Sequence, residues 1–159
     1  GVPYNAYIQR GILQPSGDNY IDYHDCFNWF RMLVEEYQIY PLKVGYDRYS
    51  AQYLVQDMQA YGFQMDDVFQ GENLYPVILE AEGLLADKKI NIGDNDLLKI
   101  HMADAAQQME RNTEQAHPRK KLVKLSRNAH VDGVAAILDA LCMRQNKWSE
   151  LGGRLMNAG

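Results

Sequence analysis

Strand-like and helix-like segments alternate along the middle of the chain, and this alternation restricts the fold more than any other feature. PLKVGY (41–46) and DDVFQG (66–71) have the character of strands. SAQYLVQDMQAYG (50–62) and NLYPVILEAEGLLADKK (73–89) have helical spacing. This order is typical of α/β proteins, in which helices cover the faces of a sheet. We therefore predict an α/β fold with a mixed sheet flanked by helices.

The flanking segments continue the same alternation. Further strands are predicted at 11–14, 90–92, 107–114 and 120–125, and further helices at 23–37, at 94–106 and from Asp132 onward. The last helix is predicted to bury one face, formed by apolar residues at helical spacing: Val131, Val134, Ala135, Leu138, Leu141 and Cys142. The strands 107–114 and 120–125 are expected to form a hairpin that turns at QAHP (115–118). The residues at 149–159 contain two adjacent glycines and are predicted to be a flexible tail.

The size and composition of the chain fit one domain, which we assign to residues 1–148. A chain of 159 residues with 47% hydrophobic residues is long enough to bury a substantial core. Its apolar runs are much shorter than the roughly 20 residues that span a bilayer, so no membrane partner is expected. Cys26 and Cys142 match neither a CxxC pair nor a zinc-ligand spacing. Both are expected to be reduced thiols in an intracellular protein.

Positive charge is concentrated in one stretch although the net charge is −5. The negative total argues against a protein that holds nucleic acid through its overall charge. Between residues 117 and 130, however, the chain has no acid and carries five cations, Arg119, Lys120, Lys121, Lys124 and Arg127. These residues are candidates for contacts with the phosphates of a nucleic acid. A solvated basic strand explains the same pattern equally well.

Two aspartates are the candidate metal ligands. Asp47 follows a predicted strand, and sites in α/β sheets form beyond the carboxyl ends of strands. Asp132 lies in the first turn of the last predicted helix, where the helix dipole favours a carboxylate. Magnesium and manganese prefer such oxygen ligands, and Gly133 and Ala136 would leave room for an ion and a phosphate. From spacing alone, structural roles for both acids are more common.

Other polar clusters have simpler interpretations. Asp22 is predicted to cap the helix at 23, with Asp25 in its first turn, because the GDNYIDYHDC segment lacks the spacing of a calcium loop. Asp66 and Asp67 are predicted to form a turn at the start of a strand, although either could support a metal through water. The histidines match no zinc motif and are expected to be ordinary surface or core residues: His101, His117 and His130, with Asp104 nearby.

Four segments in order resemble a known family. They are GVPYNAYIQRGIL, KVGYDRYSAQYLVQDMQAYGF, the strand containing Gln70 and Gly71, and RNAHVDGVAAILDAL. Together they resemble the C-terminal nuclease domain of the large subunit of tailed-phage terminases. The resemblance implies a ribonuclease H-like fold and endonuclease cleavage of concatemeric viral DNA. It also implies that Asp47 is the second acid of the metal cluster and Asp132 the last. It suggests further that the QAHP turn forms a flexible hairpin gate. Lys124, which is close in sequence to Asp132, is expected to lie over the scissile phosphate.

The same resemblance implies the cofactors and partners. Two Mg²⁺ or Mn²⁺ ions are expected, one to activate water and one to stabilise the departing oxygen. The expected partners are double-stranded viral DNA, the terminase ATPase domain, the small subunit and the portal protein, in the host bacterial cytoplasm. The family's first acid lies on opening strands that would precede residue 1, so the domain is expected to be N-terminally incomplete and of uncertain activity alone. A ribonuclease H-like resolvase or transposase nuclease and a non-catalytic docking domain are the alternatives.

Overall fold

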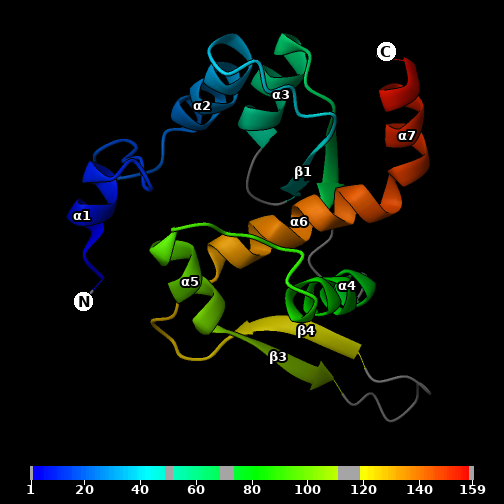
Figure 1. Ribbon diagram of the computed structural model, residues 1–159. Helices are drawn as coiled ribbons and strands as arrows, with labels where there is room; N and C mark the ends of the chain where they lie inside the picture. The colour runs from blue at the N-terminus through cyan, green and yellow to red at the C-terminus, as the bar shows by residue number, and fades with distance from the viewer. Residues whose placement is uncertain (1, 49–51, 69–73, 111–118, 158–159) are drawn as a thin grey trace. The chain divides into compact units, whose positions relative to one another are not determined.

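A computed structural model describes residues 2–48, 52–68, 74–110 and 119–157 (Figure 1). The chain divides into two compact units, Gly1–Asp66 and Asp67–Gly159, each with its own buried residues. The strands of the described residues form two pairs, β1 with β2 and β3 with β4. The expected mixture of helices and strands is therefore present, and the described strands lie in two small sheets.

The first unit contains a strand, helix and strand in succession. Its elements are α1 (Tyr4–Gln9), α2 (Tyr23–Glu35), β1 (Val44–Asp47), α3 (Gln52–Tyr61) and the start of β2 (Met65–Val68). The four predictions between residues 23 and 71 are confirmed in type. The predicted strand at 11–14 is wrong. That segment directly follows α1, and Gly11 adopts a φ of 68° there, so the backbone turns rather than extends.

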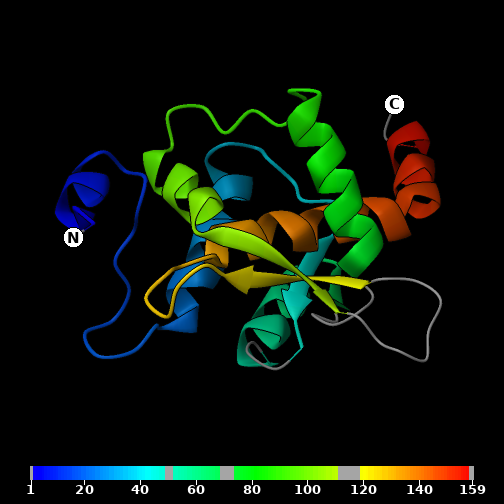
Figure 2. The same ribbon diagram turned by 90° about the horizontal axis from the view of Figure 1, so that it is seen from below.

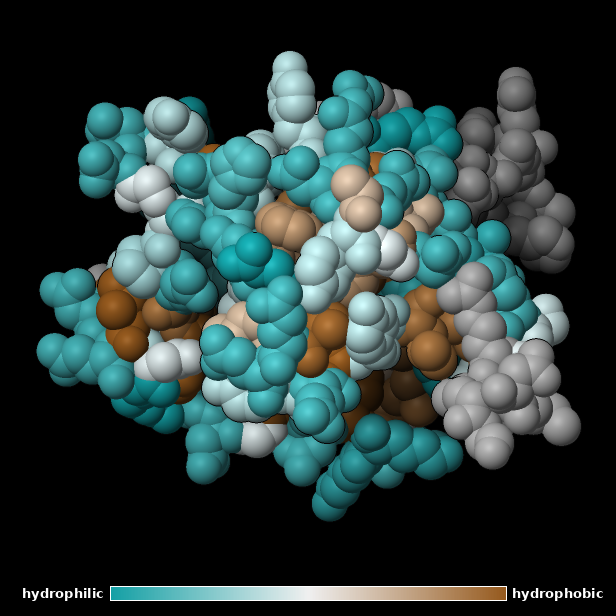
Figure 3. All heavy atoms as spheres, turned by 90° about the horizontal axis from the view of Figure 1, so that it is seen from above, coloured by the Kyte–Doolittle hydropathy of each residue, from teal (hydrophilic) through white to brown (hydrophobic). Residues whose placement is uncertain are grey.

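Aromatic packing joins α2, α3 and the chain entering β2. Phe63 is buried, and its ring centroid lies 5.3 Å from that of Tyr61, on which it stacks, and 5.9 Å from that of Phe30. Gly62, with a φ of 117°, follows the end of α3 and directs Phe63 into this cluster. Other apolar side chains reach the surface between polar ones, which Figure 3 shows as brown among teal.

The second unit contains a hairpin and four helices among its described residues. They are α4 (Tyr75–Ala86), α5 (Asp96–Ala103), β3 (Ala105–Glu110), β4 (Arg119–Lys124), α6 (Asp132–Asn146) and α7 (Trp148–Asn157). The predicted hairpin is confirmed, because β3 and β4 pair antiparallel from Ala105 with Lys124 to Glu110 with Arg119. Its predicted turn, 115–118, lies outside the described residues. Figure 2 shows the hairpin from below, and its strand β4 contacts α4.

Three boundaries in the second unit differ from the prediction. Residues 90–92 form no strand, because they lie between turns at Lys88 and Gly93, whose φ values are 55° and 56°. The helix predicted to 106 ends at Ala103, and the next residues pair with β4 instead. Residues 148–157 form α7, through both glycines of the segment predicted as a glycine-broken tail.

An apolar cluster among the described residues holds the second unit together. It joins α4 to α6, and its buried members are Val68, Leu74, Val77, Ile78, Ala81, Leu138, Cys142 and Met143. The predicted apolar stripe of the last helix is confirmed, since Leu138 and Cys142 are in the cluster while Val134 and Leu141 pack against it. Cys26 and Cys142 are both free thiols, as expected. No helix among the described residues is long and apolar enough to cross a membrane.

Candidate functional site

Asp47 is the last residue of β1, as predicted for an acid at a strand end. The strand is four residues long, with a bend before it at Leu42 and a turn after it at Arg48, and every residue of β1 is half-buried. Asp47 therefore stands where the strand stops, partly accessible to solvent. This position suits a ligand carboxylate, since the backbone beneath it is fixed by pairing with β2.

An ion pair lies beside the same strands. Lys43 Nζ is 3.3 Å from Asp66 Oδ2, and the two side chains are only 9% and 31% exposed. Asp66 lies within β2 rather than in a turn before it, so the turn predicted for Asp66 and Asp67 is wrong. The partial burial makes each charge depend on the other, because removing one would leave the second poorly solvated. The ion pair therefore gives Asp66 a structural partner.

Asp132 is the first residue of α6, in the second unit. Its carboxylate is 78% exposed, and His130 Nδ1 lies 3.8 Å from its Oδ2. The N-cap residue before it is Val131, which makes no side-chain hydrogen bond to the helix. Asp132 itself occupies the first turn, where an acid is favoured by the positive end of the helix dipole. A carboxylate that is this exposed, at a fixed helix start, is accessible to a cation from solvent.

The end of α5 holds the chain on both sides of Asp132. The backbone N–H of Gly133 donates to His101 Nδ1 at 3.0 Å. The N–H of His130 donates to Asp104 Oδ2 at 3.4 Å, and the rings of His101 and His130 stack with centroids 6.3 Å apart. Asp104 also accepts the N–H of Leu125 through its backbone oxygen at 2.9 Å. These contacts were not foreseen, because the residues are far apart in sequence.

Gly133 makes room for α5, where the sequence suggested room for an ion and a phosphate. A Cβ at Gly133 would lie 2.7 Å from Leu98 Cδ1 and 3.1 Å from His101 Nδ1. The Leu98 methyl would have to move, and the imidazole would be crowded. The absent side chain thus lets the two helices approach closely enough for the hydrogen bond from the Gly133 N–H.

The structure divides the basic residues rather than gathering them. Lys121 and Lys124 are exposed on β4, but strand alternation places Lys124 on the face of Leu122, which packs against the core, and Lys121 on the other. Arg127 is exposed in the turn that leads to α6. Arg119 and Lys120 begin β4, and their side chains lie outside the described part. Lys124 and Arg127 both come shortly before the start of α6 in the sequence.

The donor chemistry of the two candidate acids suits a hard divalent ion. Asp47 and Asp132 each offer carboxylate oxygens, the ligands preferred by Mg²⁺ and Mn²⁺. Asp47 belongs to the first unit and Asp132 to the second, and each is described within its own unit. Over the described ranges, no three His, Cys, Asp or Glu side chains form a group able to hold a metal.

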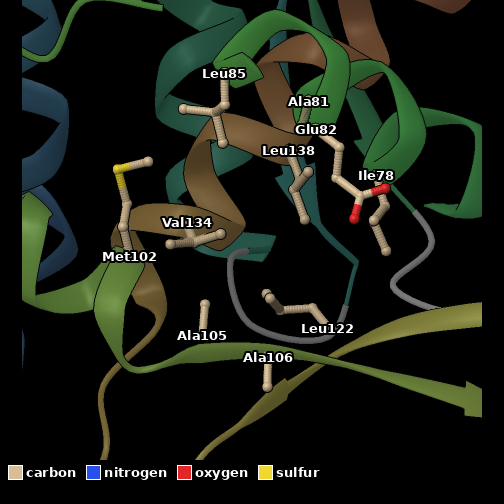
Figure 4. A pocket seen from close by; sticks show the side chains of 10 residues that line it. All are labelled: Ile78, Ala81, Glu82, Leu85, Met102, Ala105, Ala106, Leu122, Val134 and Leu138. Atoms are coloured by element: carbon tan, nitrogen blue, oxygen red, sulfur yellow. The ribbon is translucent and has the colours of Figure 1, made fainter.

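A separate pocket in the second unit has the wrong chemistry for phosphate. It measures about 400 Å³ and lies between α4, α6 and the hairpin (Figure 4). Apolar side chains form most of its wall, and Glu82 adds a negative charge. A phosphodiester would be poorly solvated there and repelled by Glu82. The pocket is therefore not a candidate for the nucleic-acid site.

Sequence reasoning missed His101 as a partner of the Asp132 segment. The bond from the Gly133 N–H joins residues 32 positions apart, and no local pattern encodes such a pairing. One indirect signal was present. Val131 is a poor N-cap residue, so a helix starting after it must satisfy its free N–H groups from elsewhere.

Comparison with known proteins identifies one family and one structural relative. A family model described as "Terminase large subunit, endonuclease domain" matches residues 2–147, across both units. The crystal structure of the HK97 bacteriophage large terminase is similar with a TM-score of 0.73 and 18% identity. That match covers 88% of this chain and 28% of the HK97 chain, so it concerns the fold of one part of a longer protein. No curated protein sequence matches.

Proposed function

This chain belongs to the terminase large subunit endonuclease domain family, and on that basis we propose that it cuts concatemeric viral DNA during phage genome packaging. Family membership makes it a phage DNA-packaging nuclease domain, with the ribonuclease H-like fold expected from sequence and shared with the HK97 large terminase. The observation that carries the proposal is the family match over residues 2–147, which includes both candidate acids. Metal dependence and the concatemeric substrate are the parts that go beyond it.

Asp47 and Asp132 are the proposed metal ligands. Both lie in the segments that resemble the family's acidic motifs, and both stand at the end of a regular element. Asp132 supports the assignment further, because its carboxylate is exposed and its backbone is fixed on both sides. Divalent ions held by these acids would stabilise the charge that develops on the phosphate during hydrolysis. Mg²⁺ or Mn²⁺ fits the oxygen donors.

The basic stretch is the proposed contact with the DNA backbone. Lys124 and Arg127 precede Asp132 closely in the chain and are exposed, so they are best placed to hold phosphates near that acid. Arg119, Lys120 and Lys121 extend the same stretch along β4. Such contacts add affinity without reading sequence, which fits an enzyme that acts on long viral DNA.

The remaining partners follow from the role in packaging. A terminase large subunit works with an ATPase domain, a small subunit and a portal protein, and we propose all three as partners in the host bacterial cytoplasm. Nicking in the presence of divalent ions is the property that this chain itself would contribute.

The test of the function is nicking of supercoiled plasmid with Mn²⁺ or Mg²⁺. The protein is expressed with any sequence that flanks it in its gene and compared with Asp132→Asn, Asp47→Asn and the control Asp87→Asn. Asp87 is exposed at the end of α4 and pairs with Lys89. Loss of a metal ligand is expected to reduce nicking by about 100-fold or more, whereas the control keeps full activity.

Two results would contradict the proposal. Nicking that persists in EDTA would remove the metal from the mechanism. A folded, metal-treated protein that neither cuts DNA nor binds Mn²⁺ would favour the docking-domain alternative instead.

DNA contact has its own measurement. The Lys124→Ala, Arg127→Ala double variant is expected to bind duplex DNA more weakly and to lower the slope of log K against log salt by roughly 2, because each lost phosphate contact removes about 0.9. Lys89→Ala, on an exposed lysine after α4, is the matched control. An unchanged slope in the double variant would show that these two cations do not touch the backbone.

A further inference from the structure

The start of α6 lacks the local cap that a helix normally has. Val131 occupies the N-cap position and makes no side-chain hydrogen bond. The first N–H groups of a helix have no partner within it, and an unsatisfied N–H in a partly buried place costs free energy. At Gly133 the missing acceptor comes from another helix, as His101 Nδ1 on α5, at 3.0 Å. The imidazole of His101, 32 residues away in the chain, thus takes the place of a local side-chain cap.

The end of α5 is hydrogen-bonded to the start of α6 at two positions, one on each side of Asp132. His101 holds the residue after Asp132, and Asp104 holds His130, two residues before it. Neither contact involves the Asp132 carboxylate, which remains 78% exposed. The backbone of Asp132 is therefore fixed while its side chain stays available.

From this arrangement we infer that His101 is a positioning residue, which fixes the first turn of α6 so that Asp132 is presented to the divalent ion. His101 acts through the Gly133 N–H and does not touch the ion. A ligand that is already oriented loses less conformational freedom when it binds a metal. This inference rests on the proposed function, because it concerns the same ion and the same carboxylate.

The chemistry of the bond defines the matched variants. Only a ring nitrogen without hydrogen accepts the Gly133 N–H, so Nδ1 is the acceptor and a neutral ring carries its hydrogen on Nε2. In His101→Asn the side-chain oxygen sits where Nδ1 was and can accept the same bond. His101→Leu branches at the same atom but offers no acceptor. The two substitutions therefore differ chiefly in the hydrogen bond.

The test measures Mn²⁺ affinity by calorimetry and the exchange rate of the Gly133 amide by NMR, on the folded protein. His101→Leu is expected to weaken Mn²⁺ binding about tenfold and to speed exchange at Gly133, as loss of an outer partner of a metal ligand does. His101→Asn is expected to restore both. If His101→Leu does not fold, His101→Gln replaces it, because its acceptor lies one bond farther from the backbone.

The outcomes separate this inference from the function it rests on. Asp132→Asn that leaves Mn²⁺ affinity unchanged, or a parent protein without Mn²⁺ binding, overturns the proposed function and the inference with it. If Asp132→Asn abolishes binding while His101→Leu keeps the parent affinity, the inference alone is overturned. Equal losses in His101→Asn and His101→Leu would also overturn it, because the acceptor would then be irrelevant.

Discussion

The helices α2 and α6 begin in opposite ways. At α2 the cap is local, because Asp22 accepts the N–H of His24 at 2.9 Å, and Ser16 donates to Asp25 at 2.7 Å. At α6 the cap residue is apolar, and the acceptor is His101 on a different helix. The start of α2 is therefore held by residues within ten positions of one another. The hydrogen bond at the start of α6 forms only when α5 packs against α6 in the folded unit.

The two helices also differ in how many of their residues are buried against the rest of their unit. No residue of α2 is fully buried, although all of α2 is described. In α6, Leu138, Cys142 and Met143 are buried in the apolar cluster. A locally capped helix can rely on its own sequence, whereas α6 depends on tertiary contacts at its start and along its length. The candidate metal ligand Asp132 lies on the helix of the second kind.

The largest expected effect is on the free energy of unfolding, when a leucine of α6 or of α2 is shortened. Leu138→Ala should lower the free energy of unfolding by about 2–5 kcal/mol, because it leaves a cavity in the core. Leu33→Ala, on the half-buried face of α2, should cost less than about 2 kcal/mol. Urea unfolding measures both, and the two tryptophans help, since Trp29 lies in α2 and Trp148 in α7. Equal costs would show that α2 is as dependent on packing as α6.

A glycine pair sharpens the contrast at the helix start. Gly133→Ala should destabilise the protein by about 1–3 kcal/mol, because its Cβ would crowd Leu98 and His101. Gly83→Ala, inside α4 with open space around its Cβ, should stabilise by about 0.5–1 kcal/mol. Thermal unfolding of the two variants shows whether each is less or more stable than the parent protein. A Gly133→Ala variant as stable as the parent would mean that α5 and α6 need not approach so closely.

The local cap of α2 predicts a smaller loss. Asp22→Ala should cost about 1 kcal/mol, since the N–H of His24 loses its acceptor. Asp22→Asn should cost only a few tenths, because asparagine caps about as well. Chemical denaturation distinguishes the two. If alanine and asparagine behave alike, the Asp22 side chain does not hold this helix start.

The smallest effect is on the reactivity of Cys26 in the first turns of α2. A helix start normally favours a thiolate. Here burial raises the pKa of the Cys26 thiol above its ordinary value of 9.0, and Asp25 and Asp22 raise it further. Alkylation at pH 8 should therefore be slow, and Asp25→Asn should speed it roughly twofold by lowering that pKa.

The control for this rate is Asp18→Asn, on an exposed residue in the preceding bend. Mass spectrometry separates labelling of Cys26 from that of Cys142, whose thiol pKa is also raised by burial and then by Asp139. An unchanged rate in Asp25→Asn would show that burial alone controls Cys26.

Local pattern was enough for the type of most elements and for the places of both candidate acids. The spacing of Leu138 and Cys142 predicted a buried stripe, and the hairpin strands were found from their composition. The failures were local as well. Residues 11–14 and 90–92 contain apolar side chains but lie beside positive-φ turns, and such short runs cannot be distinguished from loops without the backbone. The helix through Gly152 and Gly153 was missed because propensity alone argued against it.

The sequence by itself determined where Asp47 and Asp132 lie along their elements, the Asp22 cap, and a resemblance that the family match then confirmed. Those features depend on neighbours within a few residues, or on motifs read in order. Only the tertiary structure decided what holds Asp132 in place and why residue 133 is a glycine. Both depend on α5 approaching α6, and that contact joins side chains and backbone atoms that chain connectivity keeps far apart.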